Sequence, residues 1–77
     1  MNLESFINEL NSIDECRIRY LTKVYLVSDT YKIILKLLYV EDIKIIEDYL
    51  NIKLTDGRIL NLKIDDNLRF WREESLI

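Results

Sequence analysis

The spacing of apolar residues predicts an amphipathic helix at the start of the chain. After Asn2 these residues recur every three or four positions, which is the period of a helix with one buried face. They are Leu3, Phe6, Ile7 and Leu10. Glu4 lies in the first turn, where a carboxylate interacts favourably with the helix dipole, and the helix is expected to end near Ser12.

From Cys16 onward the apolar period changes to two, which predicts a hairpin. Its first strand covers residues 16–27, its turn lies at Ser28 and Asp29, and its second strand covers residues 31–40. A connection with an even number of residues places the apolar positions of both strands on one face and the cations on the other. An odd number would mix the two sets, so an even connection is expected.

A second hairpin is predicted over residues 52–64, with its turn at Asp56 and Gly57. A three-residue loop over residues 55–57 keeps the apolar side chains of both strands on one face, whereas a two-residue loop does not. Gly57 is then expected to adopt the left-handed backbone conformation that glycine tolerates.

The two remaining segments are predicted to be short helices. Helical spacing favours a helix over residues 41–50, although Ile43 to Ile46 is also compatible with a short strand. Residues 65–67 provide a helix cap for a C-terminal helix. The apolar residues of that helix are Leu68, Phe70, Trp71 and Leu76.

The expected fold class is therefore α+β, in one small domain over residues 1–77. The two hairpins are expected to form a four-stranded sheet. The N-terminal helix, the intervening short helix and the short C-terminal helix are expected to cover it.

Composition narrows the class of protein. Of the 77 residues 49% are hydrophobic and 32% are charged, which excludes a disordered chain. The low Cys and Met content and the absence of Gln favour a heat-adapted source, whereas six Asn residues argue against one.

The single Cys16 cannot close an intramolecular disulfide, so a reducing compartment, the cytoplasm, is expected. The start of the chain does not resemble a signal peptide, and no apolar run is long enough to span a bilayer.

Charge is segregated along the chain, although the net charge is only −3. Residues 1–16 carry −4 and residues 17–38 carry +4. In the predicted register these cations share one face with an aromatic ring, which suits a phosphate backbone with its bases or an acidic protein. A solvated sheet face is the alternative. The residues of this candidate binding face are Arg17, Arg19, Lys23, Tyr25, Lys32 and Lys36.

A second candidate site is the C-terminal cluster Arg69, Phe70, Trp71 and Arg72. Trp and Arg dominate protein interfaces because they bury a large area and make directed contacts. In the predicted helix Leu68 and Trp71 share a face and Phe70 does not. Trp71 then either closes the core or docks against a second copy or another protein.

The sequence offers little support for catalysis. It has no His, no phosphate-binding loop, no nucleophile motif and no metal-ligand spacing. Asp42 and Lys44, with Asp29 upstream, have the acid-x-Lys order of metal-dependent nucleases, but this match covers only three residues. The acidic doublets diverge on a helix or strand and do not converge on an ion. No catalytic residue, metal or cofactor is therefore expected.

These observations predict a non-enzymatic protein-interaction module. The expected role is that of a small accessory subunit, regulator or inhibitor of a larger complex, from a virus or another mobile element. Its expected partner is another protein or a second copy in a homodimer, since a small chain rich in Ile and Leu leaves sheet surface to be covered. The alternative is a nucleic-acid-binding protein that uses the basic face of the 16–40 hairpin.

Overall fold

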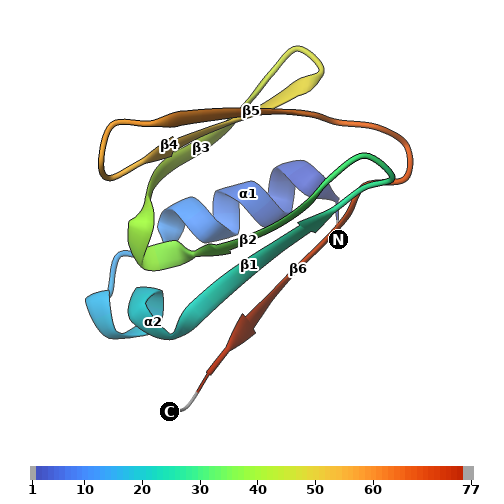
Figure 1. Ribbon diagram of the computed structural model, residues 1–77. Helices are drawn as coiled ribbons and strands as arrows, with labels where there is room; N and C mark the ends of the chain where they lie inside the picture. Colours follow the sequence, from blue (N-terminus) through green and yellow to red (C-terminus); the bar gives the residue numbers. More distant parts are fainter. Residues whose placement is uncertain (1, 76–77) are drawn as a thin grey trace.

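The computed structural model describes residues 2–75, which form an N-terminal helix followed by two antiparallel three-stranded sheets (Figure 1). The helices are α1 (Leu3–Ser12), α2 (Cys16–Leu21) and the 3₁₀ turn η1 (Leu37–Tyr39). The strands are β1 (Thr22–Val27), β2 (Lys32–Lys36), β3 (Val40–Ile46), β4 (Tyr49–Leu54), β5 (Ile59–Lys63) and β6 (Arg69–Glu74). We call the sheet with strand order β2-β1-β6 sheet A and the sheet with order β3-β4-β5 sheet B.

Helix α1 confirms the sequence prediction. The Asn2 side chain caps it by accepting a hydrogen bond of 2.8 Å from the backbone N–H of Ser5. Its apolar stripe buries Phe6, Ile7 and Leu10.

The first predicted strand is only half correct, because residues 16–21 form helix α2. The Arg19 side chain explains the difference, since it turns inward. Its guanidinium donates hydrogen bonds to the backbone carbonyls of Ile13, Leu37 and Val40. Strand β1 then begins at Thr22, whose hydroxyl donates to the Ile18 carbonyl at 2.7 Å.

The pairing of β1 with β2 confirms the predicted register. Lys23 lies opposite Lys36 and Val24 lies opposite Leu35, so the connection of residues 28–31 has an even number of residues. The second predicted strand ends at Lys36, earlier than expected, because η1 turns the chain from sheet A into sheet B.

Residues 40–46 form strand β3, so the helix favoured over residues 41–50 is wrong and the alternative strand is right. Ile43 lies opposite Ile52 of β4, and both are buried. A tight turn at Glu47 and Asp48 joins β3 to β4, and Glu47 has the positive φ (55°) that such turns use. The hydrogen-bond partners that β4 supplies therefore favour a strand here, despite the helical spacing of the apolar residues.

The β4–β5 hairpin confirms both predictions made for it. Ile52 lies opposite Leu60, and the Leu54 N–H donates to the Arg58 carbonyl at 2.8 Å. The loop therefore consists of residues 55–57, and Gly57 has a φ of 92°.

The predicted C-terminal helix is wrong, since residues 69–74 form strand β6 along β1. Instead of capping a helix, the Asp65 side chain accepts from the Asn67 N–H at 2.9 Å in a local turn. Phe70 then faces the core and Trp71 faces outward, as alternation in a strand requires. Leu76 lies outside the described residues.

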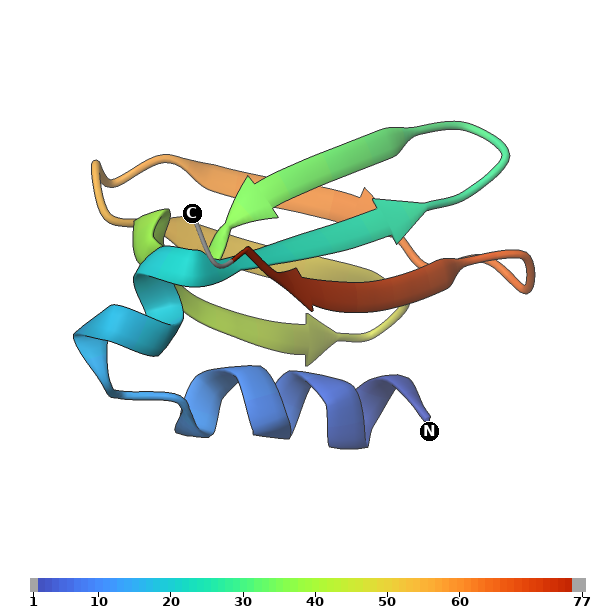
Figure 2. The ribbon, with the colours of Figure 1, turned by 90° about the horizontal axis from the view of Figure 1, so that it is seen from below.

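The predicted four-stranded sheet is also wrong, because the two hairpins belong to different sheets. These sheets stack face to face, and α1 packs beside β3 on the side of the sandwich that lies between β3 and β6 (Figures 1 and 2). The Asn11 side chain caps the edge of β3 by donating to the Ile43 carbonyl at 2.7 Å and accepting from the Ile43 N–H at 3.2 Å. The buried residues of the core are Phe6, Ile7, Leu10, Val24, Leu26, Leu37, Val40, Ile43, Leu50, Ile52 and Leu54.

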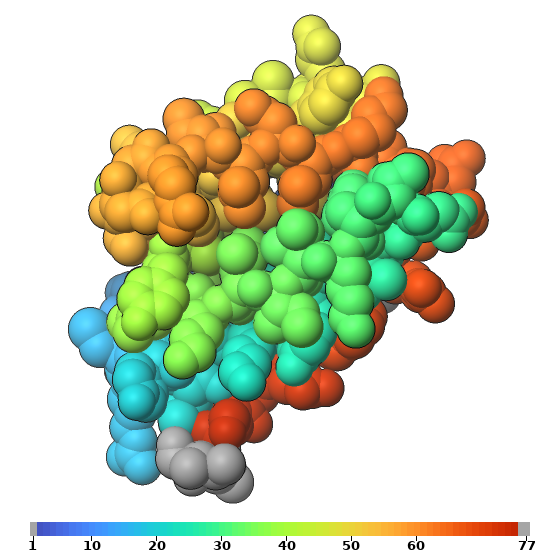
Figure 3. All heavy atoms as spheres, viewed as in Figure 1, coloured from blue at the N-terminus to red at the C-terminus, as the bar shows by residue number. Residues whose placement is uncertain are grey.

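The other open side lies between β2 and β5. Tyr31, just before β2, donates a hydrogen bond from its hydroxyl to the Lys63 carbonyl at 2.8 Å. In Figure 3 the side chains of β2 (green) lie beside those of β5 (orange). Both open sides of the sandwich are thus partly closed. Over residues 2–75, no helix or strand covers the outer face of sheet A (Figure 2).

Candidate functional site

The outer face of sheet A gathers most of the candidate residues into three rows that cross the strands. The strand register defines these rows, because side chains of paired residues lie side by side on one face. In the order β2-β1-β6 the rows are Lys36, Lys23 and Glu73; Ile34, Tyr25 and Trp71; and Lys32, Val27 and Arg69. Figure 2 looks onto this face.

Four cations lie in the two flanking rows, namely Lys23, Lys32, Lys36 and Arg69. All four are exposed, and within residues 2–75 none of them forms an ion pair. Lys23 lies directly opposite Lys36, and like charges in that position repel. A bound anion would relieve this repulsion, so the electrostatics of this face favour anion binding.

The central row is aromatic and apolar. The rings of Tyr25 and Trp71 stack with centroids 5.0 Å apart and an interplanar angle of 4°. Trp71 nevertheless stays 41% exposed, and Ile34 on the other flank is 51% exposed. A large apolar surface therefore remains open to solvent between the two cationic rows.

Glu73 is the only acidic residue among these nine positions. Its carboxylate accepts a hydrogen bond of 3.2 Å from the Tyr25 hydroxyl. Desolvation and this neighbouring carboxylate both raise the pKa of Tyr25 above its ordinary value. Tyr25 consequently stays a neutral hydrogen-bond donor at physiological pH, which holds its ring under Trp71.

Four of the six residues predicted for the basic face are brought together here, and two are not. Lys23, Tyr25, Lys32 and Lys36 share the face as expected. Arg17 and Arg19 belong to α2, where Arg17 is exposed and Arg19 holds backbone carbonyls.

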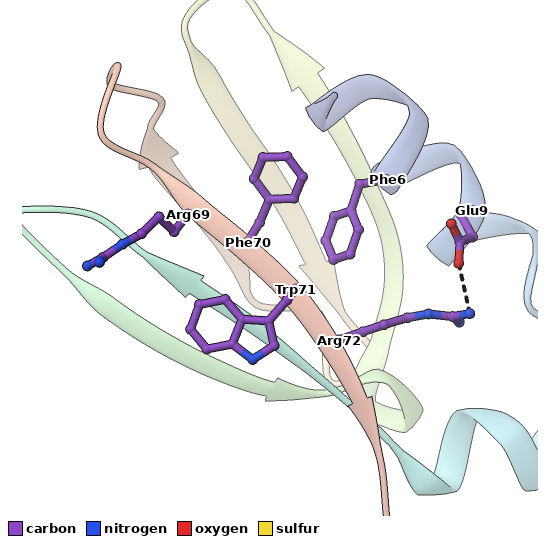
Figure 4. Close-up of a pocket in the computed structure, with 6 residues that line it drawn as sticks. All are labelled: Phe6, Glu9, Arg69, Phe70, Trp71 and Arg72. Atoms are coloured by element: carbon purple, nitrogen blue, oxygen red, sulfur yellow. Dashed lines mark ion pairs between the residues drawn. The ribbon is translucent and has the colours of Figure 1, made fainter. Parts of the chain in front are cut away.

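The C-terminal cluster divides between the two faces of β6 (Figure 4). Arg69 and Trp71 join the outer face. Phe70 packs inward against Phe6, with ring centroids 4.9 Å apart. Arg72 also points inward and forms an ion pair of 2.8 Å with Glu9 of α1. The prediction that Phe70 and Trp71 lie on different faces is therefore confirmed. The alternation of side chains along a strand produces this arrangement, and not the helical spacing that was expected.

Ile34 and Glu73 were missed by sequence reasoning. Ile34 lies between Lys32 and Lys36, and alternation along the predicted strand already puts it on their face. The sequence pattern was therefore sufficient to place Ile34 there. Glu73 could be placed only once β6 was known to be a strand. Within residues 2–75 no group of three or more acidic or Cys side chains could hold a metal ion.

A groove of about 560 Å³ runs along the free edge of β6. It is lined by Phe6, Glu9, Arg69, Phe70, Trp71 and Arg72. Figure 4 shows Phe6 and Phe70 on one side of the strand and Trp71 on the other. The edge of β6 is therefore flanked by aromatic side chains and is open to solvent.

No protein-family model, no curated protein and no solved structure matches this chain. No helix within residues 2–75 is long and apolar enough to cross a membrane.

Proposed function

We propose that this protein is a non-catalytic binding module whose outer face of sheet A binds single-stranded nucleic acid. The observation that carries the proposal is the stacked pair Tyr25 and Trp71, exposed between two rows of cations that have no ionic partner within residues 2–75. Sequence-independent binding of single strands uses this combination, because aromatic rings stack on bases and cations follow the phosphates.

The distribution of charge supports binding of a polyanion at the outer face of sheet A. Four cations and Glu73 give the face a charge of +3, so the rest of the chain carries −6. A polyanion is attracted to this face and repelled by the others. An acidic pI of 4.8 is therefore compatible with nucleic-acid binding at one surface.

Exposed single strands fit the face better than a duplex. Trp71 and Tyr25 offer ring surface, which only an unstacked base can use. From Lys36 to Lys32 the face spans about 13 Å along the strand, at 3.3 Å per residue. One copy therefore contacts a short stretch of strand, and its affinity should be modest and strongly dependent on salt.

The test is the binding of a fluorescently labelled oligothymidylate, measured by anisotropy at two salt concentrations. The double variant Lys23→Glu/Lys36→Glu should weaken binding at low salt by about 10-fold or more and reduce the slope of log affinity against log salt by about 1.4. The matched control is Lys44→Glu/Lys53→Glu, which makes the same charge change on exposed positions of sheet B. An equal loss in both variants, or no binding by the wild type at low salt, would overturn the proposal.

Trp71 provides an independent readout because it is the only tryptophan. Base stacking should quench its fluorescence, and Trp71→Leu should remove about 1–3 kcal/mol of binding free energy. A duplex of the same length should bind more weakly than the single strand.

An acidic protein segment is the second candidate ligand. Ile34 and Val27 favour it, since aliphatic side chains on this face bury well against protein but do not stack on bases. A polyglutamate peptide that binds as tightly as the oligonucleotide, and loses affinity on Ile34→Ser, would assign the face to such a partner.

A further inference from the structure

The outer edge of β6 is a sheet edge at which no strand and no side chain of residues 2–75 bonds to the backbone. The Ser75 N–H donates to the Leu21 carbonyl, so alternate residues of this segment, from 69 to 75, direct their backbone groups toward β1. The intervening residues Phe70, Arg72 and Glu74 must then direct theirs to the free edge. Within residues 2–75 no backbone or side-chain group bonds to them there.

The other edges are treated differently. The Asn11 side chain occupies the edge of β3. The edges of β2 and β5 lie toward each other, and Tyr31 bonds across them to Lys63. An open edge carrying free N–H and C=O groups is a template for another strand.

The side chains on the outer face of β6 are complementary to those of a second β6 strand that runs antiparallel to it. Arg69, Trp71 and Glu73 alternate along it as cation, aromatic ring and anion. We propose that two copies of this protein pair through β6 in an antiparallel dimer centred on Trp71. In that register Arg69 of each copy lies opposite the partner's Glu73, and the two Trp71 rings are neighbours.

The backbone supports the same register. Pairing centred on Trp71 places Phe70 opposite the partner's Arg72, and both residues direct their N–H and C=O groups to the free edge. These residues can therefore exchange ladder hydrogen bonds. A shift by one residue would place the bonding groups of one strand against the non-bonding positions of the other.

The groove of about 560 Å³ beside Phe70, Trp71 and Arg72 is the space that the added strand would begin to fill. The dimer would also join the two outer faces into one six-stranded surface. Its central row would run from Ile34 through Tyr25 and Trp71 into the partner's copy of the same row. Arg69 would pair with the partner's Glu73, which leaves Lys23, Lys32 and Lys36 of each copy as the cations that can meet a bound anion. The dimer would thus enlarge the surface proposed to bind nucleic acid, but dimerisation through β6 does not depend on that proposed function.

The charge pairing can be tested by sedimentation equilibrium without nucleic acid, so its outcome is separate from that of the oligonucleotide assay. The wild type should form a dimer at micromolar concentrations. Arg69→Glu and Glu73→Arg should each weaken dimerisation by about 10-fold or more, because each puts two pairs of like charges face to face.

An equimolar mixture of these two variants should dimerise again, because each variant is complementary to the other and not to itself. Circular dichroism of each variant alone is the check that it is folded. A wild type that stays monomeric up to several hundred micromolar, or a mixture that dimerises no better than either variant alone, would overturn the proposal.

A cross-link tests the register directly. In a Cys16→Ser background, Trp71→Cys places two thiols opposite each other in the proposed dimer, and mild oxidation should give a disulfide-linked dimer. Thr30→Cys, in the exposed β1–β2 turn, is the control that should cross-link much more slowly. Equal rates at the two positions would contradict the pairing through β6.

Discussion

At the scale of single residues, the cations of this chain have different roles that their spacing does not reveal. Arg17 and Arg19 are two positions apart, and both are expected on the basic face from the alternation of the sequence. In the structure Arg17 is exposed, whereas Arg19 joins α2 to the residue after α1, to η1 and to the start of β3 through three backbone carbonyls. An arginine can do this because its long apolar stem spans packed regions and its fork carries five donors.

Arg19→Met keeps most of the apolar stem and removes the donors. The free energy of unfolding should fall by about 2–3 kcal/mol, since partly buried carbonyls lose hydrogen bonds to a charged group. Urea unfolding followed by circular dichroism measures this change. Arg17→Met on the same helix should stay within about 0.5 kcal/mol of wild type, and equal effects at both positions would contradict the role assigned to Arg19.

At the scale of elements, local chemistry predicts turns well and isolated short segments poorly. The β4–β5 loop follows from Asp56, Gly57 and the apolar alternation on either side. The Asp56 side chain accepts from the Arg58 N–H at 3.0 Å, and this hydrogen bond lowers the pKa of Asp56. Helices were expected over residues 41–50 and after the cap at residues 65–67. Strands β3, β4 and β6 form there instead, because neighbouring strands supply their hydrogen-bond partners.

Gly57 provides a test of the loop geometry. An L-alanine at its φ of 92° should destabilise the protein by about 1 kcal/mol, because L residues avoid this region. A D-alanine introduced by chemical synthesis should instead stabilise it by about 0.4–1 kcal/mol, since D residues favour positive φ and restrict the unfolded chain more than glycine does. Thermal unfolding of the two synthetic proteins gives the comparison, and the same sign for both would refute this account of the turn.

At the scale of the whole molecule, α1 holds the two sheets in their arrangement. It covers the edge of β3 through Asn11 and reaches β6 through Phe6 and Glu9. The acidic helix therefore lies on a side of the protein away from the outer face of sheet A, which carries the unpaired cations (Figure 2). The separation of charge in space follows from this placement as much as from the charge blocks in the sequence.

Phe6→Ala should remove the main contact between α1 and β6. Phe6 is 4% exposed, so the free energy of unfolding should fall by about 3–5 kcal/mol. Because that loss can unfold so small a domain, Phe6→Leu serves as the milder variant, with an intermediate loss expected. Urea unfolding measures both, and the exposed aromatic Tyr39 provides the control Tyr39→Ala with little change.

The sequence by itself determined the features that depend on near neighbours. Helix α1, the even β1–β2 connection, the three-residue β4–β5 loop and the grouping of Lys23, Tyr25, Lys32 and Lys36 all follow from periodicity and turn chemistry. Only the tertiary structure decided the division into two sheets, the extended form of β6 and the inward path of Arg19. Each of these depends on hydrogen-bond partners far away in the chain. Trp71 reaches the basic face for the same reason, because β1 supplies the strand edge that makes residues 69–74 a strand.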